Sequence, residues 1–465
     1  MDFEGYTSPF SWRYASVEMR SLWSENSKRR YWRQAWLALA QTQVEFDLVS
    51  PEQAADIAAH ADEIDLPRAL EIEAQIQHDL MAELRTFAEQ CPVGGGVLHL
   101  GATSMDIEDT TDALRIRNAL NIVLPKLRTL LLTLAQKIEQ WADIPVMAFT
   151  HLQPAEPTTL GYRFASYAQD LFADWQDLAR IRDSVRGKGF KGAVGTAASY
   201  AELIGASRLP EFEVSLSRRM GIPFFNIATQ TYPRRQDYLV ISALAGMGAA
   251  LYKFAFDLRF LQSPPIGELS EPFGRHQVGS SAMPFKRNPI QSEKIDSLAR
   301  ALAQMPAVAW NNAAHSLLER TLDDSANRRT LLPEAFLITD ELLQTTQKII
   351  EGIRVNFHAV KNNMEIYGPF ASTERLLMVL GKAGADRQLM HERLREHALA
   401  AWEEVQNGQI NPLVQRLVAD PVFNSYVQPS EIVTLLQAAD YLGNAPDRAR
   451  SLAHLILSEL DNPGL

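Results

Sequence analysis

The sequence is short of cysteine: Cys91 is the only one among 465 residues. One cysteine cannot form an internal disulfide, which favours a reducing compartment and excludes a metal site built from several cysteines. Basic residues are also outnumbered, because 45 Lys and Arg stand against 56 Asp and Glu, for a formal net charge of −11. An acidic surface repels polyanions, so the composition argues against nucleic acid as a general partner. Any phosphate must be bound by a local basic pocket.

Long hydrophobic runs and targeting signals are missing as well. The first residues, Met1–Gly5, lack the basic start and apolar run of a signal peptide. The longest apolar stretch, about 239–251, is interrupted by Ser242 and followed by Lys253. It is shorter than the ~20 residues that span a bilayer. We therefore expect a soluble, cytoplasmic protein with no membrane partner. The sequence also shows no metal-binding motif and no dinucleotide fingerprint after a strand, so we expect no metal and no cofactor.

Helical periodicity dominates what is present. Apolar residues recur mostly at three- and four-residue steps from Leu114 to Ile138, the pattern of a long helix with one buried face. Similar patterns predict further helices at 158–186, 236–261, 290–310 and 329–353. Strand-like alternation is rare and short. These features predict an all-α fold around a central bundle of long helices, and a bundle this long often packs on copies of itself.

The flanking segments differ from this central block. Residues 1–103 contain shorter helical patterns broken at Pro51, Pro67 and Cys91–Gly96. Residues from about 356 onward contain short helical patterns separated by glycine and proline. The sequence therefore predicts three helical domains, at 1–103, 104–355 and 356–465.

The most informative segment is Gly279–Pro289, which reads GSSAMPFKRNP. It follows a proline- and glycine-rich run and precedes a helix expected to begin near Ile290. Two serines, a lysine and an asparagine before a helix N-terminus suit an anionic ligand, because the helix end offers unpaired N–H groups and positive potential. A solvated loop that caps a helix is the alternative, and it is the commoner origin of an arbitrary Ser/Gly/Pro loop.

This segment resembles the signature loop of the fumarase/aspartase superfamily, G-S-S-x-M-P-x-K-x-N-P. Counting seven of its fixed letters (the two serines, Met, Lys, Asn and the two prolines), a chance match has a probability on the order of 10⁻⁹ per position. Gly101–Asp106 and Thr150–Ala155 resemble the first and second conserved regions of the superfamily, in the same order. We expect all three regions at helix ends, with Pro157 marking the start of the helix after His151. For His151 alone, a histidine at a helix entry bonded to backbone is the alternative.

Within the superfamily, the sequence is similar to the adenylosuccinate lyases over nearly its whole length. The segment Arg320–Arg329, RTLDDSANRR, carries this resemblance most clearly, because fumarases and aspartases lack it. Two arginine guanidinium groups and the Ser325 hydroxyl, near the expected start of a helix, also form a cluster of a size that suits a phosphate group. A role in capping the helix N-terminus would explain the two aspartates and the serine of this segment, but it would not explain the paired arginines. Further matches are Arg13–Ser16, His78–Asp79, Gln230–Tyr232, Lys286–Pro289, Ala335–Leu337 and Lys382–Gln388.

The resemblance implies a β-elimination that releases fumarate from a succinyl-amino substrate by breaking a C–N bond. This chemistry needs a base, stabilisation of a doubly charged aci-carboxylate and an acid for the leaving nitrogen. By motif position, Ser280 is the base, provided that loop closure brings it near Lys286 and the helix N-terminus. His151 matches the acid, and Glu293 matches the carboxylate that orients it.

The remaining matched residues are implied to bind substrate. Lys286 and Asn288, with Thr103 and Ser104, would hold the succinyl carboxylates, and His78 would lie near the leaving group and the phosphate. The implied nucleotide contacts are Arg13, Tyr14, Gln230, Arg320, Ser325 and Arg329. Other substrate-site positions in the same motifs are Gln77, Asp79, Gln153, Ser281 and Lys294.

Three of these positions depart from the pattern of the family. Gln77 and Lys294 stand where arginine is common, and Glu156 stands where glutamine is common. The first two changes remove guanidinium forks that would grip phosphate. Which succinyl nucleotide is preferred is therefore left open.

The resemblance also implies a homotetramer whose active sites are shared between chains. Thr103, His151 and Ser280 are expected at the ends of different long helices, which need not all meet at one end of a single bundle. Two alternatives remain. Another lyase of the superfamily, such as an argininosuccinate lyase, is disfavoured by Arg320–Arg329. A non-catalytic structural protein on this scaffold is disfavoured by the intact serine, lysine and histidine.

Overall fold

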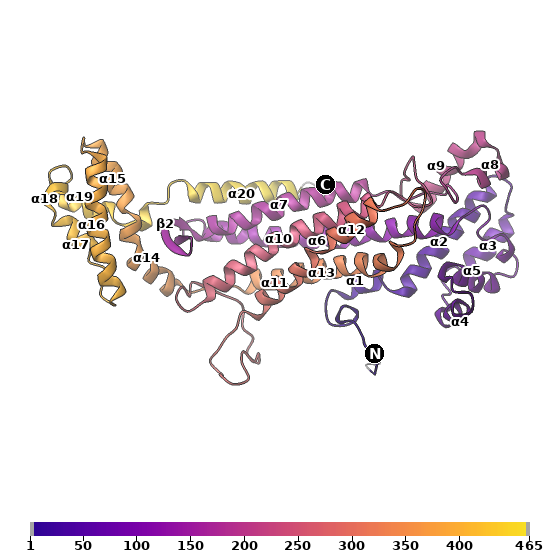
Figure 1. Cartoon of the computed structure of the whole chain (residues 1–465), viewed down its shortest axis with the longest axis horizontal. Helices are drawn as coiled ribbons and strands as arrows, with labels where there is room; N and C mark the ends of the chain where they lie inside the picture. Colours follow the sequence, from indigo (N-terminus) through magenta and orange to yellow (C-terminus); the bar gives the residue numbers. More distant parts are fainter. Residues whose placement is uncertain (1–3, 462–465) are drawn as a thin grey trace. The chain divides into compact units, whose positions relative to one another are not determined.

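Helices make up most of the chain in the computed structural model, which describes residues 4–461 (Figure 1). Within those residues the strands form two antiparallel two-stranded sheets. One joins β1 (Pro145–Thr150) to β2 (Gln153–Thr159), and the other joins β3 (Leu269–Ser270) to β4 (Arg354–Val355). The predicted all-α fold class is confirmed.

Four of the five predicted long helices are present. They are α6 (Ser104–Trp141), α7 (Leu160–Ser184), α10 (Arg235–Gln262) and α13 (Ser325–Gly352). Their periodicity reflects burial: Leu120, Leu127 and Leu134 of α6, each two turns apart, are at most 1% exposed.

The fifth predicted helix, 290–310, is wrong as a single element. It divides into α11 (Ile290–Leu302) and α12 (Met305–Ala314). Pro306 lies in the first turn of α12, where its missing N–H costs no hydrogen bond, whereas inside a continuous helix it would break one. The apolar pattern continues across the break, so periodicity alone did not reveal it.

Shorter elements occupy the rest of the chain. Before α6 lie η1 (Pro9–Ser11), α1 (Val17–Leu22), α2 (Glu25–Val44), α3 (Pro51–His60), α4 (Leu66–Ile76), α5 (Asp79–Gln90) and η2 (Gly95–Val97). Between α7 and α10 lie α8 (Ala198–Ile204), η3 (Ala206–Arg208) and α9 (Leu209–Met220). After β4 follow α14 (Phe357–Ala371), α15 (Thr373–Lys382), α16 (Arg387–Gln406), α17 (Leu413–Val418), α18 (Pro421–Asn424), α19 (Pro429–Leu435), η4 (Ala438–Asp440) and α20 (Ala445–Leu460).

The chain forms two compact units, each assembled from separate segments. The first contains the chain up to Leu127, Asp174–Ala249 and Ser297–Gln344. The second contains Arg128–Ala173, Ala250–Asp296 and the chain from Thr345 onward. The core of the first unit includes the buried rings of Trp32, Trp36, Tyr200, Phe212 and Phe336, and that of the second includes Phe164, Leu376, Leu380, Leu413 and Phe423. The division into three domains in chain order stays a prediction.

One helix among the described residues, α10, is long and apolar enough to cross a membrane by length and composition. A core helix of a soluble protein passes the same test. In α10 the side chains of Ile241, Leu244, Met247 and Leu251 are fully buried within the protein. Burial within the protein accounts for these four apolar side chains, and 44% of the most apolar window of α10 is buried.

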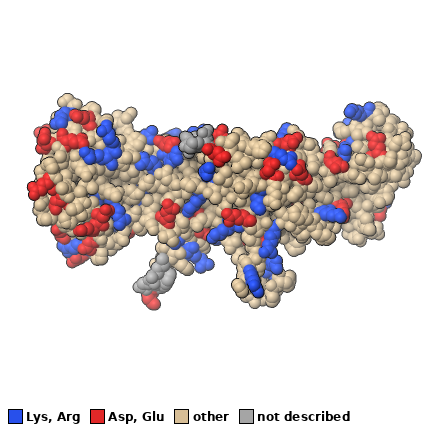
Figure 2. Space-filling model, turned by 180° about the vertical axis from the view of Figure 1, so that it is seen from behind, with Lys and Arg blue, Asp and Glu red and all other residues tan. Residues whose placement is uncertain are grey.

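Charged side chains of both signs are interspersed on the face drawn in Figure 2. This distribution agrees with the composition, in which Asp and Glu outnumber Lys and Arg, 56 to 45. A polyanion would meet acidic groups beside basic ones on that face, so phosphate recognition must come from a more local arrangement.

Candidate active site

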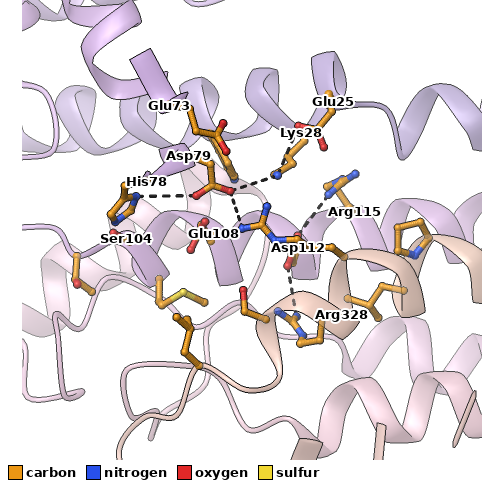
Figure 3. A pocket seen from close by; sticks show the side chains of 18 of the residues that line it. Glu25, Lys28, Glu73, His78, Asp79, Ser104, Glu108, Asp112, Arg115 and Arg328 are labelled. Carbon is orange, nitrogen blue, oxygen red and sulfur yellow. Dashed lines mark hydrogen bonds and ion pairs between the residues drawn. The ribbon is translucent and has the colours of Figure 1, made fainter. Parts of the chain in front are cut away.

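A cavity of about 530 Å³ lies in the first unit (Figure 3). Its walls come from α2, from the α4–α5 junction, from the start of α6 and from the start of α13. Nine residues predicted from the sequence to bind substrate line it: Gln77, His78, Asp79, Thr103, Ser104, Gln230, Arg320, Ser325 and Arg329. Segments more than 250 positions apart in the sequence thus meet at one cavity.

The junction between α4 and α5 presents three of these residues. Gln77 ends α4 in a left-handed conformation, with φ of 55°, which turns the chain sharply. His78 is the N-cap of α5, where its Nδ1 accepts a hydrogen bond from the Met81 N–H at 3.4 Å. Asp79 is the first residue of α5, so its carboxylate also gains from the positive end of the helix.

The first turn of α6 contributes Thr103 and Ser104. The Thr103 N–H donates to the Asp106 carboxylate at 3.0 Å. Asp106 is fully buried, and it also accepts from the Lys191 and Gly192 N–H groups at 3.1 Å and from the Lys188 ammonium. This buried carboxylate fixes the start of the helix, so the two hydroxyls stand at an end with positive potential.

Arg329 reaches the cavity already paired. Its guanidinium donates to the Asp79 carboxylate at 2.9 Å, and the Lys28 ammonium lies 3.7 Å from the same carboxylate. Burial opposes ionisation of Asp79, but Lys28 and Arg329 together lower its pKa. The Arg329 side chain stays 53% exposed, so it can bind a second anion without leaving Asp79.

A buried ionic network holds the wall behind Arg329. The Arg234 guanidinium donates to both Asp109 oxygens, at 2.9 and 3.0 Å, and to Asp324 at 2.6 Å. Arg328 donates to Asp237 at 2.8 Å and to the Tyr232 hydroxyl at 2.8 Å. The five charged side chains of this network are at most 7% exposed, and the Tyr232 ring is fully buried. The network joins α6, the segment before α10, α10 itself and the start of α13.

The same wall of the cavity holds Arg320 and Gln230 in position. The Arg320 guanidinium donates to Asp324 at 2.9 Å, and the Gln230 N–H donates to the Glu319 carbonyl at 3.1 Å. Burial alone would raise the pKa of Asp324, but the guanidiniums of Arg234, Arg328 and Arg320 lower it. Ser325 begins α13.

Several charged residues that line the cavity were missed from the sequence: Lys28, Glu108, Asp112, Arg115 and Arg328. Glu108 and Asp112 follow Ser104 at four-residue steps on α6, which puts all three on one face of the helix. That spacing was the available signal. Burial raises the pKa of Glu108 to about 8, and the charges of Asp79 and Asp112 add to the effect.

The signature loop belongs to the second unit. Asn288 Nδ2 donates to the Gly279 carbonyl at 3.1 Å and closes the loop at its base. A Cβ on Gly279 would lie 2.1 Å from the Lys286 carbonyl, so glycine is required there. The Ser280 hydroxyl accepts from the Met283 N–H at 3.1 Å. Ser281 and the Lys286 side chain are exposed, and within residues 4–461 the Lys286 ammonium has no partner.

His151 does not enter a helix, so that prediction is wrong. It lies with Leu152 in the two-residue turn between β1 and β2, where Thr150 pairs with Gln153. Both turn residues have left-handed backbones, with φ of 53° and 60°. Pro157, expected to start a helix, lies in β2 and pairs with Met147. The hairpin presents the His151 side chain and that of Gln153 to solvent.

Glu293 and Lys294 lie in the first turn of α11. Glu293 is 4.0 Å from the Arg259 guanidinium, and no contact with His151 occurs within the described chain. The buried Glu271 carboxylate accepts from the Gln291 N–H at 3.2 Å and from the Ser292 N–H, which caps α11. The pairing of Glu293 with His151 stays a prediction for contacts between chains.

Arg13 and Tyr14 belong to the first unit but do not line the cavity. They follow η1, where the Arg13 guanidinium lies 5.7 Å from the centre of the Trp12 ring. The Tyr14 carbonyl accepts from Arg20 at 2.8 Å. Their predicted nucleotide contacts stay a prediction.

Comparison with known proteins decides the family. A family model described as lyase matches residues 12–303, and one described as adenylosuccinate lyase C-terminus matches residues 369–451. An adenylosuccinate lyase of Schistosoma mansoni is 38% identical over 455 residues, covering 96% of this chain and 94% of the relative. The one from Saccharomyces cerevisiae is 36% identical, with the same coverage of 96% and 94%. The chain belongs to the adenylosuccinate lyase family. It is a lyase, as its sequence predicted.

Solved structures agree on the fold. The 3-carboxy-cis,cis-muconate lactonizing enzyme of Pseudomonas putida superposes with a TM-score of 0.85 at 24% identity, covering 96% of this chain and 99% of that one. A fumarate lyase of Mesorhizobium sp. BNC1 gives 0.84 at 23% identity, covering 97% and 99%. At this identity the likeness concerns the fold alone. The match to the adenylosuccinate lyases rests on the sequence comparisons.

Proposed function

We propose that this lyase cleaves adenylosuccinate to AMP and fumarate, and the succinylaminoimidazole-carboxamide ribotide to AICAR and fumarate, in purine nucleotide biosynthesis. The observation that carries the proposal is the cavity itself. It is lined both by Arg329 and Ser325 of α13 and by Thr103 and Ser104 at the start of α6. A nucleotide phosphate suits the first pair and a succinyl carboxylate suits the second.

Proton abstraction is assigned to Ser280. The base removes the proton from the carbon next to a succinyl carboxylate, the C=C bond of fumarate forms, and the C–N bond breaks as its electron pair moves to nitrogen. A serine hydroxyl is a weak base in water, so it requires the nearby Lys286 ammonium and the α11 N-terminus to favour its alkoxide. In this structure the hydroxyl faces its own loop backbone, which makes loop closure part of the mechanism.

His151 is assigned as the acid that protonates the leaving nitrogen. Its tip position on a hairpin suits a group that must reach a substrate held elsewhere. Lys286 and Asn288 would add to the charge stabilisation of the succinyl group.

We also propose that the protein is a cytoplasmic homotetramer with active sites shared between subunits. The support is that the two sets of residues belong to different units. The residues that line the cavity belong to the first unit, whereas Ser280, Lys286 and His151 belong to the second. A neighbouring copy could supply the missing groups.

One assay tests the activity. Purified protein is mixed with adenylosuccinate, and fumarate release and the purine ultraviolet spectrum are followed together. Conversion to AMP and fumarate is expected, and its absence under conditions that keep the protein folded would contradict the proposed function.

Subunit sharing is tested by complementation. Inactive His151→Ala and Lys286→Met proteins are mixed under conditions of verified subunit exchange. If the two residues reach a site from different chains, random mixing restores roughly a quarter of the sites. No recovered activity after exchange would place both residues in one chain.

A further inference from the structure

Among the described residues that line the cavity, one carboxyl forms no ion pair. Five acidic side chains line the cavity, and four have cationic partners: Glu25 and Glu73 pair with Arg29 at 2.6 and 3.6 Å, Asp79 with Arg329 at 2.9 Å and Asp112 with Arg328 at 3.4 Å. Within residues 4–461 the fifth, Glu108, forms neither an ion pair nor a side-chain hydrogen bond. Figure 3 shows its carboxyl below Asp79 with no dashed line reaching it.

The register of α6 places Glu108 in the middle of the cavity. Ser104, Glu108 and Asp112 all line it and are spaced four residues apart, so successive positions lie about 6 Å apart along one helix face. Ser104 marks the end assigned to the succinyl group. The Arg329 guanidinium, assigned to the phosphate, donates to Asp79 and lies close enough to Glu108 for the two charges to interact. Whatever lies between succinyl and phosphate therefore faces Glu108.

In a succinyl nucleotide the part between these ends is the base and the ribose. The purine ring of adenylosuccinate offers ring nitrogens, which only accept hydrogen bonds and so can pair with just one of the two oxygens of a neutral carboxyl, the one that donates. The ribose offers two hydroxyl groups, which donate as well as accept. Ribose is also separated from the phosphate by a single methylene, which suits a residue close to Arg329. Hydroxyls are thus the complementary partners for Glu108.

We propose that Glu108 binds the ribose hydroxyls of the substrate and selects ribonucleotides over 2′-deoxyribonucleotides. This inference rests on the proposed function. Burial keeps the carboxyl largely neutral near pH 7, so Glu108 can lie in an anion-binding cavity without repelling the phosphate. A neutral carboxyl still accepts through its carbonyl oxygen and donates through its hydroxyl, and ribose can satisfy both.

The test compares adenylosuccinate with its 2′-deoxyribose analogue as substrates. Wild-type protein, Glu108→Gln, Glu108→Ala and the control Glu73→Ala are measured for kcat and KM with each. We expect wild type to favour the ribonucleotide about tenfold or more in kcat/KM, the value of one hydrogen bond to a buried group. Glu108→Ala should bring this ratio near 1 by raising KM for the ribonucleotide. Glu108→Gln keeps an accepting oxygen and should retain part of the ratio.

Glu73→Ala removes another carboxyl from the cavity lining but lies on α4, away from the α6 face, so the ratio should not change. The substrate ratio separates sugar recognition from a structural role, because a distorted cavity would weaken both substrates alike. Glu108→Gln is isosteric and gives the answer if the alanine variant fails to fold. Turnover of adenylosuccinate with the same ratio in wild type and in the Glu108 variants would overturn this inference alone. No turnover by wild type would overturn the proposed function, and this inference with it.

Discussion

Removing one buried guanidinium should loosen the whole wall of the candidate active site. Arg234 is 3% exposed and makes three hydrogen bonds to Asp109 and Asp324, which are themselves buried. In an Arg234→Met variant, Asp109 keeps the hydrogen bond from the Tyr232 N–H at 2.8 Å, but its nearest described cation is then the Arg328 guanidinium at 3.8 Å. Breaking a buried pair from one side typically costs about 3–5 kcal/mol, since it leaves an uncompensated charge. We expect a loss of free energy of unfolding in this range.

Hydrogen exchange can measure the loss locally. The Tyr232 N–H donates to Asp109 at 2.8 Å, so the peptide around it reports opening of the network. A cost of about 3 kcal/mol makes exchange roughly 150-fold faster. Peptides around Leu376 and Leu380, in the core of the second unit, serve as an internal control and should be unchanged.

Arg320→Met is the matched control variant. Arg320 also pairs with Asp324, at 2.9 Å, but its side chain is 18% exposed and so less is lost with it. The double variant Arg234→Met with Asp109→Leu should recover part of the stability, because it removes the stranded charge as well. If Arg234→Met costs less than about 1 kcal/mol, or no more than Arg320→Met, the assignment of this network as the support of the cavity wall is wrong.

Four further changes test the site. Ser280→Ala should lower turnover by several orders of magnitude while calorimetry still detects substrate binding, and turnover above about a tenth of wild type would refute the assigned base. Arg329→Ala should raise KM far more than it lowers kcat, and an unchanged KM would exclude the phosphate contact. In the folded state the pKa of Glu108 is about 8, against an ordinary 4.5, so between these pH values the folded state holds a proton that the unfolded state has lost. The free energy of unfolding should therefore fall as the pH rises through this range. Urea unfolding of Glu108→Gln should show a shallower fall. Replacing His151-Leu152 by Asn-Gly should raise the melting temperature but abolish turnover, and a lower melting temperature would contradict the strain inferred for this turn.

The long helices were predictable because their periodicity and their burial have the same cause. Leu120, Leu127 and Leu134 face the interior at two-turn intervals, and that interval is visible in the sequence. The break between α11 and α12 was not visible in this way, since the apolar pattern runs through it. Only Pro306 marks it, and proline is compatible both with a kinked helix and with the first turn of a new one.

The cavity was predictable in part. Motif resemblance identified His78, Thr103 and Arg329, which the fold brings together from three distant segments. The pairing of Arg329 with Asp79 depends on how α5 meets α13, and no local pattern encodes that meeting. The buried ion pair of Arg234 and Asp109 was not predicted from the sequence, for a related reason. Charged residues in a sequence normally indicate surface, and their burial becomes plausible only when each has its partner in place.

The hairpin turn at His151 shows why the remaining error was unavoidable. Two-residue hairpin turns with positive φ at both positions favour Asn-Gly, and His151-Leu152 carries no such signal. A left-handed backbone costs an ordinary residue about 1 kcal/mol or more, so local preference argues against this conformation. Pairing of Thr150 with Gln153 and of Pro145 with Thr159 overrides that preference and fixes the turn. An imidazole held at such a cost, at the exposed tip of a hairpin in an otherwise helical protein, is better explained by what it reaches than by what it packs against. The proposed role of His151 as the acid would account for this cost.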